Sequence, residues 1–99
     1  MGKIRHPGED IFFQAVMSLK NQEECRVFFE DICTIKELQA MAQRFRVAAQ
    51  LKENRNYNEI QADTGASSAT ISRVNKCLLY GSGGYATALE RVGKEQEDG

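Results

Sequence analysis

The chain has 99 residues, of which 41% are hydrophobic and 27% are charged, the profile of one small soluble domain. Its formal net charge of −1 excludes a protein that coats nucleic acid through an overall basic charge. Three cysteines without a Cys-x-x-Cys pair argue against a disulfide framework and are expected to be small apolar residues in a reducing compartment. The single histidine, His6, has no ligand partners nearby, so no metal site is expected.

The longest apolar-rich run, from Ile11 to Leu19, is too short to span a bilayer. No basic-then-apolar leader precedes it, so the protein is expected to be cytoplasmic. The only proline is Pro7, and the middle of the chain lacks the alternation typical of strands. Helices are therefore expected throughout.

The first two helices are predicted near the N-terminus. One is expected from about Glu9 to Lys20, with acidic residues in its first turn that suit the helix dipole. The next is expected to begin after Asn21 as N-cap, with Glu24 three residues on. Its apolar residues recur on one helical face at Cys25, Phe28, Phe29 and Ile32.

The third helix has the strongest pattern. Thr34 and Glu37 form a Thr-x-x-Glu capping box, in which each side chain satisfies an unpaired backbone N–H. A continuous apolar stripe follows at Ile35, Leu38, Met41, Ala42, Phe45 and Ala49. The helix is expected to end near the segment Glu53–Asn56, because its two asparagines disfavour continuation.

Three more helices are predicted in the second half. A short helix in residues 57–64 should end at Gly65, which can take the left-handed conformation of a helix C-terminus. A second should run from about Ser67 to Leu79, and the segment Gly81–Gly84 is expected to be a flexible break. A final helix is expected in residues 85–96. The predicted domain is thus all-α with six helices over residues 9–96, between flexible tails at 1–8 and 97–99.

Residues 57–79 have the pattern of a helix-turn-helix unit, in which Ile60 must meet Ile71 and Val74 across the turn. The opposite face of the second helix then presents Ser67, Ser68, Thr70, Ser72, Arg73 and Lys76. Small side chains let a helix backbone approach base edges closely, and hydroxyls can bond to bases, phosphates or waters. The region from Arg44 to Lys76 carries +3 and the rest of the chain −4, which is compatible with a basic face on an acidic body.

The segment TGASSATISRVNKCL resembles the Trp repressor family, especially in GA-x-x-ATI-[ST]-R. Upstream, Thr34, Glu37, Ala40, Arg44 and Arg46 match T-x-x-E-x-x-A-x-x-x-R-x-R in register. The longer run FFEDICT…AQR…GAS-x-ATISRV…CL-YG…ALERV is more similar still to the Trp-repressor-like proteins called YerC/YecD. The resemblance covers about residues 28–92.

The resemblance implies an intertwined homodimer that places two reading helices about 34 Å apart on a roughly palindromic operator. The family's base-facing region corresponds here to Ser67, Ser68, Ala69, Thr70 and Ser72, with Arg73 and Lys76 as phosphate contacts. Two positions that are basic in the Trp repressor are Asn58 and Gln61 here, which weakens the expected phosphate neutralisation.

The resemblance also implies a candidate effector site at Thr34, Arg44 and Arg73, where an arginine can pair with a ligand carboxylate. The alternatives remain open: Thr34 as a helix cap, Arg44 as a salt-bridge former and Arg73 as a phosphate contact. Val74 stands where the Trp repressor has a glycine beside the indole ring. A branched side chain there argues against L-tryptophan, and no cofactor is expected to be required.

Three functions compete on this pattern. The first is a sequence-specific, double-stranded-DNA-binding transcriptional regulator, a homodimeric repressor. The second is a repressor controlled by a small-molecule effector other than tryptophan. The third is a dimeric protein-interaction module that has kept the fold and lost operator binding. An enzyme is not expected, because the sequence has no nucleophile–base set and no phosphate-binding glycine loop. Cys77 is expected to face the core beside Leu78.

Overall fold

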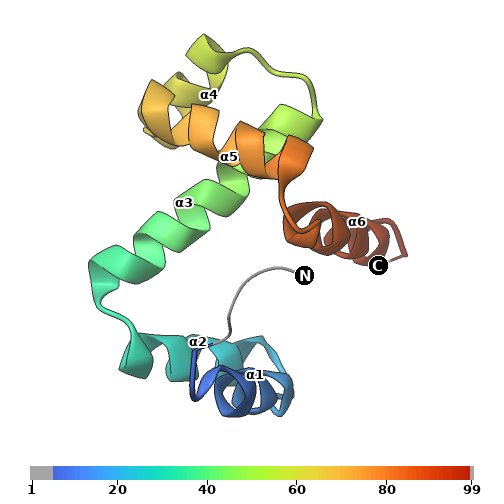
Figure 1. The fold of residues 1–99 in the computed structure, drawn as a ribbon. Helices are drawn as coiled ribbons and strands as arrows, with labels where there is room; N and C mark the ends of the chain where they lie inside the picture. Colours follow the sequence, from blue (N-terminus) through green and yellow to red (C-terminus); the bar gives the residue numbers. More distant parts are fainter. Residues whose placement is uncertain (1–5, 99) are drawn as a thin grey trace. The chain divides into compact units, whose positions relative to one another are not determined.

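A computed structural model describes residues 6–98, with side chains described as far as Lys94. Over this range the chain has six helices and no strand: α1 (Glu9–Met17), α2 (Gln22–Ile32), α3 (Ile35–Lys52), α4 (Tyr57–Thr64), α5 (Ser68–Tyr80) and α6 (Gly84–Asp98) (Figure 1). The predicted all-α fold is confirmed. In residues 6–98 we find no helix long and apolar enough to cross a membrane.

The chain divides into two compact units, residues 1–38 and 39–99, and the division falls within α3. The expectation of a single domain over residues 9–96 stays a prediction. Of the tails expected at the two ends, residues 1–5 and Gly99 lie outside the described range, whereas Glu97 and Asp98 belong to α6.

In the first unit, α1 and α2 contact each other through aromatic rings. The ring centroids of Phe12 and Phe28 lie 6.0 Å apart, and each ring also contacts the phenylalanine that follows it. Neither helix has a fully buried residue. Large apolar side chains are instead exposed along both helices, at Ile11, Phe13, Met17, Val27 and Ile32. This unit therefore has an aromatic contact but no core of its own.

The first helix is shorter than predicted, because it ends at Met17 rather than near Lys20. The Ser18 hydroxyl donates to the carbonyl oxygen of Ala15 and closes the last turn at 2.7 Å. The Lys20 backbone N–H donates to Glu24 Oε1 at 2.8 Å, so this residue belongs to the lead-in of α2. The predicted N-cap of α2 is confirmed, since the Asn21 side chain accepts from the Glu24 N–H.

The predicted capping box of α3 is also confirmed. Glu37 N–H donates to Thr34 Oγ1 at 3.0 Å, and Thr34 N–H donates to Glu37 Oε1 at 2.8 Å. The helix buries a different face from the predicted stripe, with Val47, Ala48 and Gln50 as its buried residues. Several stripe residues remain exposed, among them Ile35 at 76%. The stripe is therefore an apolar surface rather than part of this chain's core.

The second unit contains the core of the chain. Its buried residues come from α3, α4, α5 and the turn before α5: Val47, Ala48, Ile60, Ala66, Ile71 and Val74. Ile60 and Ile71 are 0% exposed and Val74 is 2% exposed, so the predicted meeting of these three side chains is confirmed. In Figure 1, α5 lies beside α4 and against the C-terminal end of α3.

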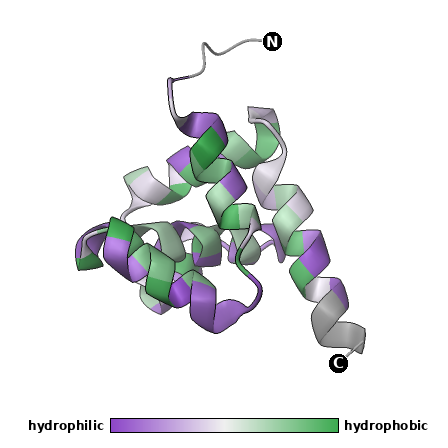
Figure 2. Ribbon diagram, turned by 90° about the horizontal axis from the view of Figure 1, so that it is seen from below, coloured by the Kyte–Doolittle hydropathy of each residue, from purple (hydrophilic) through white to green (hydrophobic). Residues whose placement is uncertain are grey.

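The final helix packs against this core from the other side of a short turn. The predicted break lies at residues 81–83, because Gly84 is already the first residue of α6. Tyr85 and Leu89, one turn apart, are half-buried against the core. In Figure 2 the turns of α6, which leads to the C-terminal end, alternate between hydrophobic and hydrophilic residues. The helix thus covers the core with one face only.

Candidate nucleic-acid interface

The helix-turn-helix unit begins with a capped α4. The Asn56 side chain accepts from the Glu59 N–H at 2.9 Å, and Glu59 Oε1 accepts from the Asn56 N–H at 3.0 Å. This capping box fixes the start of α4 and engages one of its two carboxylates. The helix ends, as predicted, at Gly65 with φ of 76°, a conformation that a side chain would strain.

The turn after α4 is tied down by its own polar groups. Thr64 Oγ1 donates to the Ile60 carbonyl at 2.7 Å and accepts from the Ala66 N–H at 3.1 Å. The Gln43 side chain of α3 donates to the Thr64 carbonyl at 3.2 Å. Because Ala66 is buried in the core, the turn is anchored by both hydrogen bonds and packing.

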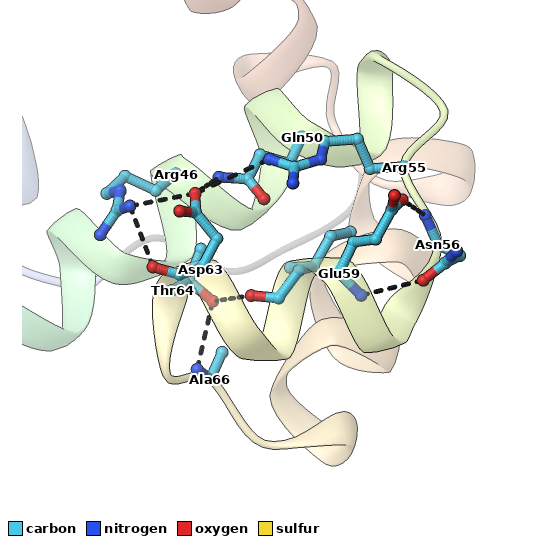
Figure 3. A network of polar contacts seen from close by, with 9 residues as sticks. Arg46, Gln50, Arg55, Asn56, Glu59, Asp63, Thr64 and Ala66 are labelled. Atoms are coloured by element: carbon cyan, nitrogen blue, oxygen red, sulfur yellow. Dashed lines mark hydrogen bonds and ion pairs between the residues drawn. The ribbon is translucent and has the colours of Figure 1, made fainter.

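Asp63 joins α4 to α3 through a network of polar contacts, which Figure 3 shows from close by. Its carboxylate accepts from Arg46 at 3.3 Å and from the buried side chain of Gln50, and it pairs with Arg55 at 3.7 Å. Arg46 also donates to the Asp63 carbonyl at 3.2 Å. The Asp63 carboxylate therefore interacts with three donor side chains, and it holds α4, the first helix of the helix-turn-helix, against α3.

Helix α5 begins after Ser67, which is its N-cap. Ser67 Oγ accepts from the Thr70 N–H at 3.1 Å and lies 3.1 Å from Thr70 Oγ1. The hydroxyls of Ser67 and Thr70 therefore satisfy each other and the helix start. Their first role is structural, whatever else they contact.

We expect Ser67→Ala to lower the free energy of unfolding by about 1 kcal/mol, because it removes the cap of α5. Urea denaturation followed by circular dichroism measures this loss. Ser68→Ala is the matched control, since Ser68 is exposed and its hydroxyl makes no hydrogen bond within the described part of the chain. Equal stability of the two variants would contradict the capping role.

The exposed face of α5 consists of the residues that the sequence predicts. Ser67, Ser68, Ala69, Ser72, Arg73 and Lys76 are exposed, and Thr70 is half-buried. Among the side chains that the structure describes, as far as Lys94, the Ser72 hydroxyl makes no hydrogen bond, and neither Arg73 nor Lys76 forms an ion pair. No acidic residue occurs on α5. This face therefore offers unengaged hydroxyls and two uncompensated positive charges.

Two of the three candidate effector residues meet at a hollow of about 150 Å³. Arg44 of α3 lines it together with residues of α5 and α6: Thr70, Arg73, Val74, Cys77 and Tyr85. The third candidate, Thr34, belongs to the first unit, where it caps α3. The assignment of these residues to an effector stays a prediction.

Three features differ from the expectations drawn from the sequence or were missed by them. Cys77 was expected to face the core, but it is exposed and lines the hollow, while only Leu78 packs against the core. The Asp63 network was missed, because Arg46 and Asp63 are separated along the chain and no periodic pattern connects them. Tyr85 was also missed, since it opens α6 without a motif around it.

Comparison with known proteins gives one consistent result. The family model described as Trp repressor protein matches residues 8–93. The Bacillus subtilis protein named "Uncharacterized protein YerC" is 52% identical over 95 residues, which cover 96% of this chain and 90% of that protein. The crystal structure of a TrpR-like protein from Eubacterium eligens has a TM-score of 0.86 and 49% identity, covering 90% of this chain and 92% of that one. A Staphylococcus aureus structure has the same TM-score at 42% identity, covering 90% and 89%.

Proposed function

The chain belongs to the Trp repressor family, and on that premise we propose that it is a homodimeric, sequence-specific DNA-binding repressor. The observation that carries the proposal is the exposed face of α5. It combines small side chains, unengaged hydroxyls at Ser68 and Ser72, and the unpaired charges of Arg73 and Lys76. Such a helix can enter the major groove with its start near the base edges and its cations near phosphates.

The acidic residues of the helix-turn-helix unit support this reading. Residues 57–80 contain only two, Glu59 and Asp63. Glu59 is engaged in the cap of α4, and Asp63 is engaged by two arginines and a glutamine. Each carboxylate therefore has a donor within the protein, and the charge of Asp63 is offset by Arg46 and Arg55. The segment from Arg44 to Lys76 carries +3, although the chain as a whole carries −1.

The apolar surface of the chain supports a homodimer. Helices α1 and α2 expose large apolar side chains and have no fully buried residue. In the second unit, a hollow of about 530 Å³ is lined partly by the apolar residues Phe45, Ala49, Leu89 and Val92. Exposed apolar area of this kind marks an association surface. A two-fold dimer would present two copies of α5 to successive major grooves.

The test is enrichment of bound sequences from a random duplex pool, with and without L-tryptophan. We expect one palindromic motif in both arms. Enrichment only with tryptophan would overturn the claim that the protein binds DNA without an effector. No enrichment in either arm would contradict sequence-specific DNA binding. Salt titration gives a second readout. If Arg73 and Lys76 of both copies neutralise four phosphates, the plot of log K against log salt has a slope of about −3.6.

We expect calorimetry to show no L-tryptophan binding below about 1 mM. Val74 is buried in the core and its side chain also lines the hollow between Arg44 and Arg73. The hollow of about 150 Å³ is smaller than the range of about 300–1,000 Å³ usual for ligand pockets. Sub-millimolar binding of L-tryptophan would show that the Val74 side chain moves and makes room for the indole ring. The two arginines favour a smaller, anionic molecule as the second candidate for regulation.

A further inference from the structure

We propose that Tyr85 is a positioning residue, whose ring holds the reading helix α5 against α3 in place of a bound small molecule. This inference rests on the proposed DNA-binding function and names how that function is regulated. The proposal requires that the Tyr85 ring contacts both α3 and the part of the core formed by α5. It also requires that no aromatic residue of α5 itself does the same.

The contacts of Tyr85 meet the first requirement. Its ring stacks on Phe45 of α3, with centroids 6.4 Å apart and an interplanar angle of 29°. It packs against the core to which α5 contributes Ile71 and Val74. It also lines the hollow whose other walls include Arg44 of α3 and Arg73 of α5. The ring therefore lies where α3, α5 and α6 meet.

The other contacts of α5 show why this ring matters. Ile71 and Val74 anchor the first half of the helix in the core. Toward its C-terminal end only Leu78 packs against the core, and Leu79 and Tyr80 are exposed. Tyr85 follows a three-residue turn and packs against the core that Ile71 and Val74 enter from α5, and it lines the hollow beside Cys77 of that helix. No aromatic residue of α5 itself supports the core.

Loss of the ring should therefore loosen α5 while the core at Ile71 remains. The apparent affinity for DNA falls with the fraction of molecules that hold the binding-competent form. If about one molecule in ten keeps α5 in place, the affinity falls about tenfold. Loss of the ring would enlarge the existing hollow by the volume of that ring, which leaves a space beside Phe45 for a free phenol of the same shape.

The experiment compares Tyr85→Ala, Tyr85→Phe and the wild-type protein in binding to the enriched duplex. Tyr80→Ala is the matched control, because Tyr80 is an exposed tyrosine on α5. Each protein is measured with and without millimolar p-cresol, which reproduces the tyrosine side chain. Amide hydrogen exchange of α5 is recorded without DNA. If Tyr85→Ala does not fold, Tyr85→Leu replaces it, since this variant keeps an apolar side chain and lacks the ring.

We expect Tyr85→Ala to bind at least about tenfold more weakly, to exchange faster in α5, and to recover with p-cresol. Tyr85→Phe should match the wild type, because the Tyr85 hydroxyl makes no hydrogen bond to the described residues. Wild-type affinity and exchange in folded Tyr85→Ala would overturn the inference, as would weak binding that p-cresol leaves unchanged. If the wild type binds no duplex, the proposed function fails, and the exchange data alone still decide the role of Tyr85.

Discussion

Replacing Ile71 by alanine is expected to lower the free energy of unfolding by about 2–5 kcal/mol. Ile71 is 0% exposed and lies where α5 meets α3 and α4, in a core of only six buried hydrophobic residues among those described. Because so few residues form this core, little can rearrange to fill the cavity. Stability of a small domain is about 5–15 kcal/mol, so this single change removes a large part of it.

Urea denaturation at one fixed protein concentration measures the effect. Ile71→Val is the graded control and should cost about 0.5–1.5 kcal/mol. Ser72→Ala, on the next residue and the exposed face, should change stability by no more than about 0.5 kcal/mol. A loss below about 1 kcal/mol for Ile71→Ala would mean that the core does not depend on the start of α5.

Replacing Arg73 by alanine is expected to weaken binding to the enriched duplex by about ten- to a hundredfold. Arg73 is exposed on α5 and has no ion-pair partner among the described side chains of residues 6–94, so its charge is available to a phosphate. Each lost phosphate contact also reduces the salt slope by about 0.9, or by about 1.8 for two copies. Fluorescence anisotropy over a salt series measures both quantities.

Two controls separate a phosphate contact from other roles of Arg73. Arg91→Ala removes the same charge from the exposed surface of α6 and should leave the affinity nearly unchanged. Arg44→Ala removes the other arginine of the hollow and should leave the salt slope unchanged. If Arg73→Ala bound DNA as tightly as the wild type, the result would contradict the placement of α5 in the major groove. Thr70→Ala is a weaker test, because its hydroxyl is engaged with Ser67 and its loss also affects the cap.

Local rules were sufficient to predict the six helices and several of their ends, although α1 ends at Met17 rather than near Lys20 and α6 begins at Gly84. Asn21 and Thr34 cap as expected, and Gly65 takes the left-handed conformation that the turn requires. These features depend on neighbours within three or four residues, so the sequence contains all the information they need. The three-way contact of Ile60, Ile71 and Val74 follows from the same periodicity.

Features that join distant residues were not predictable in this way. Arg46 and Asp63 lie 17 residues apart, and their contact depends on how α4 packs against α3. Cys77 was misplaced because it adjoins Leu78, whereas a neighbouring residue on a helix points about 100° away. The apolar stripe of α3 was correctly read as apolar, but only packing decides that the core takes Val47 and Ala48 instead.

The Asp63 network has a consequence for how this sequence can change over generations. One carboxylate serves Arg46, Gln50 and Arg55, so replacing it leaves a buried amide and two cations without their acceptor. Loss of any one donor, in contrast, leaves the other two in place. In an alignment of relatives, substitutions at position 63 should therefore occur together with substitutions at the three donor positions. Each donor position alone should vary more often than position 63. An alignment of relatives in which position 63 varies independently would contradict this linkage.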